Sequence, residues 1–169
     1  IYGIENPTVG LLSVGEEKSK GDLVTTQAYE LLEKSNLNFI GNVEGRDILK
    51  GSVHVIVCDG FTGNIVLKFA EGVLGLLKTK FTDYANRGLF SKMKVGMAYG
   101  TLKTIMKDFD YQEYGGVPLL GVNGVSIIGH GRSSPLAVKN MILRAEQMVR
   151  ARINETIAVR IKDIKEFTA

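Results

Sequence analysis

The sequence is poor in the residues from which metal, nucleotide and covalent sites are usually built. It has one cysteine, Cys58, two histidines and no tryptophan. A single cysteine excludes a disulfide within the chain and weakly favours a reducing compartment. No Cys/His cluster has zinc-ligand spacing, and no P-loop, Gly-x-Gly-x-x-Gly fingerprint or Gly-x-Ser-x-Gly elbow is present. The sequence therefore carries no motif for a bound metal, a nucleotide or an activated serine.

Long apolar runs and a leader segment are also lacking. No uninterrupted apolar stretch approaches the roughly 18 residues of a membrane span, and no signal peptide is visible. The first residue is Ile1 rather than Met, so we interpret the chain as a fragment whose natural N-terminus is missing. Proline is scarce, at 3 residues, whereas glycine is abundant, at 20. This balance indicates many tight strand–helix turns and not disorder.

Positive charge is concentrated in one segment. Residues 78–107 contain seven basic residues and one acidic residue, so this segment carries +6 and the remainder −3 of the net +3. Such a segment favours an acidic partner, such as an anionic membrane surface, an acidic protein or a nucleic acid. Nucleic acid is the weakest of these expectations, because aromatic residues are few and no recognition motif is present.

Apolar runs that alternate with polar turns predict an α/β domain. We expect strands at residues 9–14, 39–40 and 53–58. Asp22 is expected to cap a helix that ends at Asn36, with an inner face made of Ala28, Leu31 and Leu32. A long helix is expected after Asn64, and its apolar residues cover so much of the circumference that we predict packing on two sides.

The second half is predicted to contain a hairpin and two helical segments. Strands are expected at 117–122 and 125–129, joined by a two-residue turn at Asn123-Gly124. Ser134 and Pro135 are typical of a helix start. The inner face of that helix is expected to hold Val138, Met141, Ile142, Ala145, Met148 and Val149. A helix is then expected to continue or restart through residues 153–164.

The turn from Asp59 to Asn64 is the most distinctive stretch. It joins a predicted buried strand to the long helix, and the first N–H groups of a helix form an anion site. Gly60 and Gly63 let a ligand approach the backbone. Residues 41–47, the pair Gly115-Gly116 and the triplet 129–131 also lie at predicted strand ends, where open α/β sheets bind ligands.

Several side chains near these turns are candidates for chemistry. His130 lies between two glycines and is the better placed histidine for acid–base work, whereas His54 lies within a strand and is expected to be structural. Arg46 either binds phosphate or forms an internal ion pair with Glu44 or Asp47.

Three further residues have competing interpretations. Lys68 either reaches a bound anion or is solvated, and Asp59 either orients a catalytic group or caps the helix. Cys58 is expected to be a buried, inert thiol.

Residues 82–107 form an amphipathic basic helical segment in this interpretation. Gly88, Gly96 and Gly100 are expected to weaken any helix there. The apolar face either belongs to the core or a dimer interface, or contacts a membrane or a partner. The residues expected to make that membrane or partner contact are Leu89, Phe90, Lys92, Met93, Lys94 and Met97.

Four stretches resemble a known family when they are taken in order. They are NPTVGLLSVGEE, NFIGNVEGRD, VCDGFTGNIVLK and GGVPLLGVNGVSIIGHGRS, and they resemble the C-terminal half of PlsX-type phosphate acyltransferases. The resemblance implies a three-layer α/β/α sandwich with a mostly parallel sheet and an antiparallel hairpin, similar to the isocitrate and isopropylmalate dehydrogenase and phosphotransacetylase group. The chain would then be the C-terminal part of one such domain, with the N-terminal half absent.

The resemblance also implies an activity. It is the transfer of a fatty acyl group from acyl carrier protein to inorganic phosphate, with no cofactor or metal, by a cytoplasmic, peripherally membrane-associated homodimer engaged in phospholipid synthesis. The expected catalytic residues are His130, Asn42 and Asp59. The expected phosphate-binding residues are Arg46, Gly60, Gly63, Asn64, Lys68, Gly116, Gly131 and Ser133. Two alternatives remain: a phosphotransacetylase-like enzyme that uses acyl-CoA, and a non-catalytic scaffold that docks acyl carrier protein or the membrane.

Overall fold

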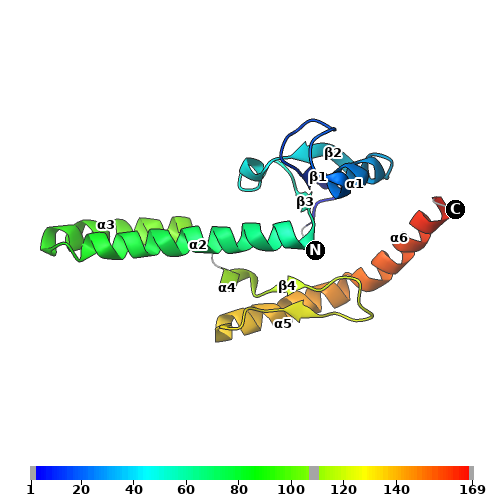
Figure 1. Cartoon of the computed structure of the whole chain (residues 1–169). Coiled ribbons are helices and arrows are strands. Elements are labelled where there is room, and N and C mark those ends of the chain that lie inside the picture. The colour runs from blue at the N-terminus through cyan, green and yellow to red at the C-terminus, as the bar shows by residue number, and fades with distance from the viewer. Residues whose placement is uncertain (1–2, 107–110, 168–169) are drawn as a thin grey trace. The chain divides into compact units, whose positions relative to one another are not determined.

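The computed structural model describes residues 3–106 and 111–167. Within that part, the side chains of residues 105, 106, 111 and 163–167 are not described. The chain divides into two compact units, Tyr2–Thr82 and Asp83–Ala169. Figure 1 labels the elements of both units, which are described separately here.

The first unit is built on a three-stranded parallel sheet in the order β2-β1-β3. Its strands are β1 (Thr8–Leu12), β2 (Asn38–Val43) and β3 (Val55–Val57). The sheet positions agree with the predicted strands, but β2 extends three residues beyond Ile40 and takes in part of the expected 41–47 loop. The remainder of that loop is a short 3-10 helix, η1 (Gly45–Asp47).

A bulge interrupts the pairing of β1 with β2. Val9 pairs with Phe39, but Leu11 pairs with Asn42, so β2 carries one extra residue there. Gly41 has a φ of +98°, a conformation that L side chains rarely adopt, and it therefore accommodates the bulge. After the bulge, Asn42 and Val43 are both buried.

The crossover helix α1 (Leu23–Glu33) connects β1 to β2 and packs on both strands. Asp22 caps it as predicted, because Asp22 Oδ1 accepts the Thr25 N–H at 2.8 Å. The rings of Tyr29 and Phe39 meet edge to face, with centroids 5.1 Å apart. Two expectations are wrong: the helix ends at Glu33 and not at Asn36, and Leu31 is 68% exposed, because the inner turn of the helix uses other positions.

Helix α2 (Gly60–Ala85) follows β3 and begins five residues earlier than expected. Residues 61–64 are therefore its first turn and not a loop, because Asp59 caps it. No side chain of α2 is buried, so packing on two sides does not occur within the described part of the chain. One 18-residue window of the helix has a mean hydropathy of 1.2, so by length and composition the helix could cross a membrane. Core helices of soluble proteins share that property, and Lys68 and Glu71 lie on it, so it assigns no membrane span.

The second unit contains helices and one small antiparallel pair. Its elements are α3 (Leu89–Met106), α4 (Tyr111–Tyr114), β4 (Val117–Pro118), β5 (Ile127–Ile128), α5 (Pro135–Arg150) and α6 (Ile153–Phe167). Gly96 and Gly100 lie inside a continuous α3, so they weaken the helix without breaking it. Lys107, the last residue of the expected amphipathic segment, lies outside the described residues.

The predicted hairpin exists, but its turn is longer than two residues. Val117 pairs with Ile128 and Pro118 with Ile127, and Leu119 N–H donates to Ser126 O at 2.9 Å. The connection therefore spans residues 119–126. Gly121, with a φ of +84°, breaks the first expected strand well before Asn123.

Helix α5 has the predicted start, and its predicted inner face is partly confirmed, since Met148 is buried and Met141 and Ala145 are half-buried. Ser134 caps it through the Ala137 N–H at 3.3 Å, and Pro135 is its first residue. Ala137 and Met148 are the buried positions, whereas Val138, Ile142 and Val149 are exposed. Helix α5 contacts α4 and β5. Asn140 Nδ2 donates to Gln112 O and Glu113 O, and Met141 lies beside the positions of Gly115 and Gly129. Arg152, at a φ of 49°, separates α5 from α6, so the helix restarts and does not continue.

The α/β class, the mostly parallel sheet and the antiparallel hairpin are thus confirmed. The arrangement of each unit is consistent with a three-layer α/β/α fold. Few apolar side chains are buried in the described residues: Val9, Leu11, Val43, Ala137 and Met148.

Candidate functional site

Two capped helix N-termini lie close together at the carboxyl edge of the parallel sheet. Asp59 Oδ1 accepts the Thr62 N–H at 2.9 Å, as Asp22 does for α1. Hydrogen bonds from the Thr62 hydroxyl and backbone N–H lower the pKa of Asp59, and the Thr25 N–H lowers that of Asp22. The charge of Asp59 also raises the pKa of Asp22, which shows that the two carboxylates are near each other. Of the two interpretations of Asp59, helix capping is the one with a contact in the structure.

The predicted phosphate site at the start of α2 therefore already holds a carboxylate. Gly60 has open space where a Cβ would lie, so its backbone is approachable. A Cβ on Gly63 would lie 3.0 Å from Cys58 Sγ, which explains the glycine by packing. Asn64 and Lys68 are exposed on the first turns. A bound anion would have to share this helix terminus with the Asp59 carboxylate, which disfavours it.

Cys58 is exposed, so the expectation of a buried thiol is wrong. The strand predicted to be buried, β3, lies at the edge of the sheet in the described part of the chain, and Val55 and Val57 within it are exposed as well.

Asn42 is the buried polar residue of the candidate site, with 8% of its surface exposed. Its side-chain amide donates to Glu17 O at 2.9 Å and so fastens the polar loop that follows β1. Its Oδ1 is buried and has no partner among the described residues. Since the bulge turns this side chain inward, Asn42 ties the carboxyl ends of β1 and β2 together.

Arg46 forms ion pairs with two carboxylates. Its Nη2 lies 3.2 Å from Glu16 Oε1 and its Nε 3.3 Å from Glu44 Oε2. The hydrogen bond to Glu16, followed by the charge of Glu44, raises the pKa of Arg46. Asp47 instead pairs with Lys50 at 2.7 Å. The internal ion-pair interpretation thus has contacts in the structure, and Glu16 is a partner that sequence reasoning missed, because it lies 30 residues away without a local signal.

His130 is held by its own loop in the second unit. Its Nδ1 accepts the Arg132 N–H at 3.1 Å. Its carbonyl oxygen accepts the Ser133 N–H at 3.0 Å and the Ser133 hydroxyl at 2.6 Å. The ring is exposed, and Gly131 beside it has open space where a Cβ would lie. His54, by contrast, binds Thr8 through Nδ1 and through its backbone N–H, which gives it a structural contact between the starts of β1 and β3.

Gly116 has a packing reason to be glycine. A Cβ there would lie 2.5 Å from Ile128 O, on the neighbouring strand of the hairpin. Its predicted role in phosphate binding stays a prediction.

The structure thus groups the candidates by unit. The unit with the parallel sheet holds Asn42, Arg46, Asp59 and the candidate residues of α2. The unit that begins at Asp83 holds Gly116, His130, Gly131 and Ser133. Within the described residues, no group of three or more His, Cys, Asp and Glu side chains could hold a metal ion.

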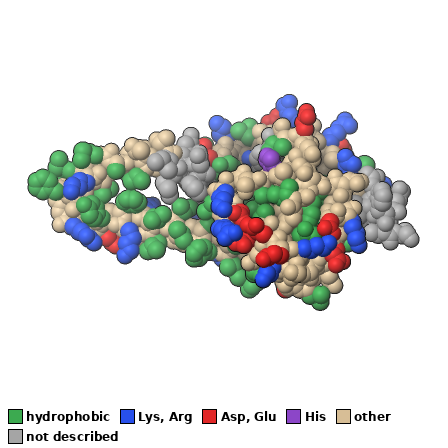
Figure 2. All heavy atoms as spheres, turned by 90° about the horizontal axis from the view of Figure 1, so that it is seen from above, with side chains coloured by type: hydrophobic (Ala, Val, Ile, Leu, Met, Phe, Trp, Pro, Cys, Tyr) green, Lys and Arg blue, Asp and Glu red, His purple; other side chains and the backbone are tan. Residues whose placement is uncertain are grey.

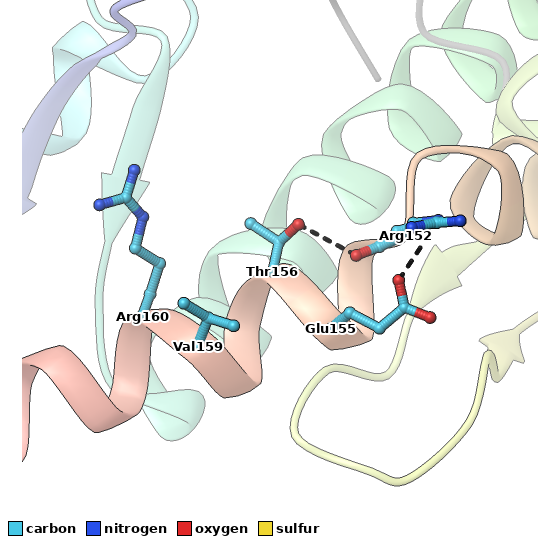
Figure 3. A pocket seen from close by; sticks show the side chains of 5 residues that line it. All are labelled: Arg152, Glu155, Thr156, Val159 and Arg160. Carbon is cyan, nitrogen blue, oxygen red and sulfur yellow. Dashed lines mark hydrogen bonds and ion pairs between the residues drawn. The ribbon is translucent and has the colours of Figure 1, made fainter.

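A surface hollow of about 410 Å³ is lined by other residues. Figure 3 shows its lining on α6 and on Arg152, the residue just before that helix: Arg152, Glu155, Thr156, Val159 and Arg160. Arg152 pairs with Glu155 at 3.6 Å, and the hollow is one open face of that helix. It contains none of the candidate residues.

The fold and these strand-end residues define a class of α/β protein that binds its ligand at the carboxyl edge of a parallel sheet. Comparison with known proteins narrows the class. The family described as "Fatty acid synthesis protein" matches residues 1–156. The chain therefore belongs to the fatty acid synthesis protein family, as the four sequence motifs predicted.

Relatives in this family include proteins named phosphate acyltransferase. The one from Pelotomaculum thermopropionicum is 50% identical over 165 residues, which are 98% of this chain and 48% of the relative. The one from Desulforudis audaxviator is 48% identical over 98% of this chain and 50% of the relative. The one from Chlorobaculum tepidum is 47% identical over 92% of this chain and 49% of the relative. The chain spans about half the length of the curated relatives it matches.

Proposed function

We propose that the protein transfers a fatty acyl group from acyl carrier protein to inorganic phosphate, which gives acyl phosphate for phospholipid biosynthesis. The observation that carries this proposal is the match of 98% of the chain, at 50% identity, to a protein named phosphate acyltransferase. The family description adds fatty acid synthesis. The acyl carrier protein as donor and phospholipid as destination go beyond those names and are part of the proposal.

The chemistry needs no protein nucleophile, because phosphate itself attacks the thioester carbonyl. The site has to bind phosphate, hold the thioester beside it and stabilise the oxyanion that forms. We assign phosphate binding to the cationic side chains Arg46 and Lys68, and not to the α2 terminus that the Asp59 carboxylate caps. Asn42 and His130 are the candidates for hydrogen bonds to the oxyanion or the departing sulfur.

Arg46 must exchange partners to take this role. Its ion pairs with Glu16 and Glu44 are on the surface, since the Arg46 side chain is 62% exposed and that of Glu16 65%. Exposed pairs of this kind contribute little to stability, because water screens them. A dianionic phosphate could therefore replace a carboxylate on the guanidinium at little cost, and the bidentate fork of Arg suits it.

The basic segment supports the proposed donor and a membrane contact. Leu89 is 75% exposed, Phe90 81% and Met97 77%, and Lys92 and Lys94 lie between them on α3. Figure 2 shows hydrophobic side chains interleaved with Lys and Arg over the region of α2 and α3. We propose that these residues contact an acidic carrier protein or an anionic bilayer from the cytoplasmic side.

We propose that α2 forms the interface of a homodimer. Its apolar side chains are exposed along its whole length, with Leu67 at 66% and Phe69 at 72%. Contiguous apolar surface of this kind usually marks an interface. A second copy of the same helix would cover it symmetrically.

Phosphate binding separates the enzyme from the alternative of a non-catalytic scaffold, which needs no phosphate site. We expect phosphate to raise the melting temperature of a form that spans the full length of the relatives, because a ligand that binds only the folded state stabilises it. Chloride at equal ionic strength should leave the melting temperature unchanged. Arg46→Gln should reduce the shift, and the matched variant Lys50→Gln, four residues away, should retain it. A melting temperature that phosphate leaves unchanged would rule out the phosphate site.

A further inference from the structure

The polar loop of residues 15–21, between β1 and α1, contacts two residues of the candidate site. Glu16 in this loop pairs with Arg46. The carbonyl oxygen of the next residue, Glu17, accepts the Asn42 side-chain amide at 2.9 Å. Asn42 lies in β2 and Arg46 in η1, which follows β2 directly. Two adjacent loop residues therefore hold both side chains, within one unit of the chain.

The two ends of this loop are fixed independently of those contacts. At its start, the Ser13 N–H donates to Val43 O at 2.9 Å, which continues the pairing of β1 with β2. The Ser13 hydroxyl donates to Lys20 O at 3.1 Å and so joins the start of the loop to its end. Gly21 turns the chain towards α1 at a φ of +110°. The middle of the loop can therefore move while its base stays in place.

The middle of the loop is held weakly. Glu16 pairs with Arg46 and Lys18 with Glu33, and these four side chains are 46–65% exposed. Water screens exposed pairs of this kind, so they resist separation little. In this conformation Asn42 Oδ1 is also buried and has no partner among the described residues. An unpaired buried acceptor disfavours the conformation that buries it, so the closed loop is poised to open.

Of the two carboxylates on Arg46, Glu16 is the one that an anion can replace. Glu44 lies two residues from Arg46, and its backbone N–H donates to Asp47 Oδ2 at 3.0 Å, which fixes it at the start of η1. Its side chain is 26% exposed, whereas that of Glu16 is 65% exposed. Glu16 comes from a separate loop, 30 residues away in the chain. It can leave the guanidinium without disturbing η1.

We propose that Glu16 is an internal competitor of phosphate at Arg46, and that phosphate opens the 15–21 loop by taking its place. This inference rests on the proposed function. A carboxylate and a phosphate use the same N–H donors of a guanidinium, so they compete for it. Because Glu17 follows Glu16, its carbonyl oxygen moves with the loop and releases the Asn42 side-chain amide. Phosphate binding thus frees the amide that is a candidate donor to the oxyanion.

Phosphate affinity tests the competition, measured by calorimetry on a form that spans the full length of the relatives. Glu16→Gln keeps the length of the side chain and removes its charge. The Kd for phosphate should fall about threefold to fivefold, the scale of an exposed ion pair. Melting temperatures should stay close to that of the wild type, because the substituted side chain is on the surface.

Glu33→Gln is the matched control. It removes the same charge and releases Lys18 of the same loop, but it leaves both carboxylates on Arg46. The Kd for phosphate in this variant should stay within about twofold of the wild type. An unchanged Kd in Glu16→Gln, or an equal fall in Glu33→Gln, would overturn the proposal.

Hydrogen exchange of residues 16–20 reports the opening of the loop without an activity assay. The Lys20 N–H donates to Glu17 O at 2.9 Å in the closed loop, so its exchange should be faster once the loop opens. Phosphate should speed exchange in the wild type, and chloride at equal ionic strength should leave it unchanged. In Glu16→Gln the exchange should be fast without phosphate. Slower exchange with phosphate would mean that the loop closes on its ligand, which overturns the proposal.

Failure of the competition can be told apart from failure of the proposed function. If the wild type binds phosphate and Glu16→Gln binds it no better, the competition fails and the phosphate site stands. If neither protein binds phosphate, the phosphate site of the proposed function fails, and the competition fails with it.

Discussion

At the residue scale, the candidate site is shaped by side chains that accept backbone N–H groups a few residues ahead. Asp22, Asp59 and Ser134 each accept from the residue three positions on, and His130 from the residue two positions on. These contacts are local, so sequence patterns predict them well. They place two carboxylates at the carboxyl edge of the sheet and fix the imidazole in the second unit.

The two capping aspartates make stability depend on pH in a defined direction. Their pKa values are lower in the folded state than in the unfolded chain, because the Thr62 hydroxyl and N–H and the Thr25 N–H favour the charged forms. The stabilisation is therefore present above the unfolded pKa and is lost as pH falls through the folded pKa. Asp59→Asn should flatten the fall in stability below about pH 4, measured by urea unfolding across a pH series.

A neighbouring residue provides the control for that measurement. Asn64 lies on the same first turns of α2 and does not ionise, so Asn64→Ala should leave the slope with pH unchanged. If the stability of Asp59→Asn falls with pH as steeply as that of the wild type, the helix terminus does not stabilise the Asp59 carboxylate.

The contacts that sequence reasoning missed at this scale are all distant in the chain. Arg46 was predicted to pair with Glu44 or Asp47, and it does contact Glu44, but it also reaches Glu16. The Asn42 contact with Glu17 spans 25 residues. No local periodicity encodes such pairs, because they depend on how the loop after β1 returns over β2.

At the element scale, the positions of helices and strands followed from the sequence better than their inner faces. Helices α1, α2, α3 and α5 and the hairpin β4–β5 were expected, and α6 was one of two expected continuations. The predicted faces of α1 and α5 were partly wrong, because several apolar residues on them are exposed. Contact with β1 and β2 sets the face of α1, and contact with α4 and β5 sets that of α5. The prediction of a two-residue hairpin turn was wrong, because Gly121 redirects the chain before the Asn-Gly pair.

Helix α3 has a composition suited to an interface with a membrane. Its exposed Leu89, Phe90 and Met93 alternate with lysines. Changing these three residues to Ser should strongly reduce cosedimentation with vesicles rich in anionic phospholipid, because apolar insertion and lysine attraction act together.

The matched control changes exposed apolar residues elsewhere. Val14 is 82% exposed and Leu37 54%, and both belong to the unit before Thr82. Val14→Ser with Leu37→Ser should leave vesicle binding intact. Full binding by the α3 triple variant would remove α3 as the membrane contact.

At the scale of the whole molecule, the balance of buried and exposed apolar side chains points to association. Few apolar residues are buried in the described part of the chain, and none of them lies on α2. A soluble chain rarely leaves so much contiguous apolar surface uncovered.

The proposed homodimer can be tested on α2 itself. We expect light scattering on the full-length form to give twice the monomer mass. Leu67→Lys with Phe69→Lys should shift that mass towards the monomer, because charges within an apolar interface are costly to bury. Ser91→Lys with Thr101→Lys on α3 adds the same charge, serves as the matched control and should stay dimeric. A monomeric wild type would contradict the dimer.

The most direct test of the account is formation of acyl phosphate. Long-chain acyl carrier protein and phosphate are incubated with the full-length form and, separately, with this chain, and the product is trapped by hydroxylamine as a hydroxamate. The account predicts phosphate-dependent product from the full-length form, with acyl carrier protein a better donor than the same acyl group on CoA. Equal or faster turnover with acyl-CoA would favour the phosphotransacetylase-like alternative. No product from a folded full-length form would contradict the proposed transfer and favour the scaffold.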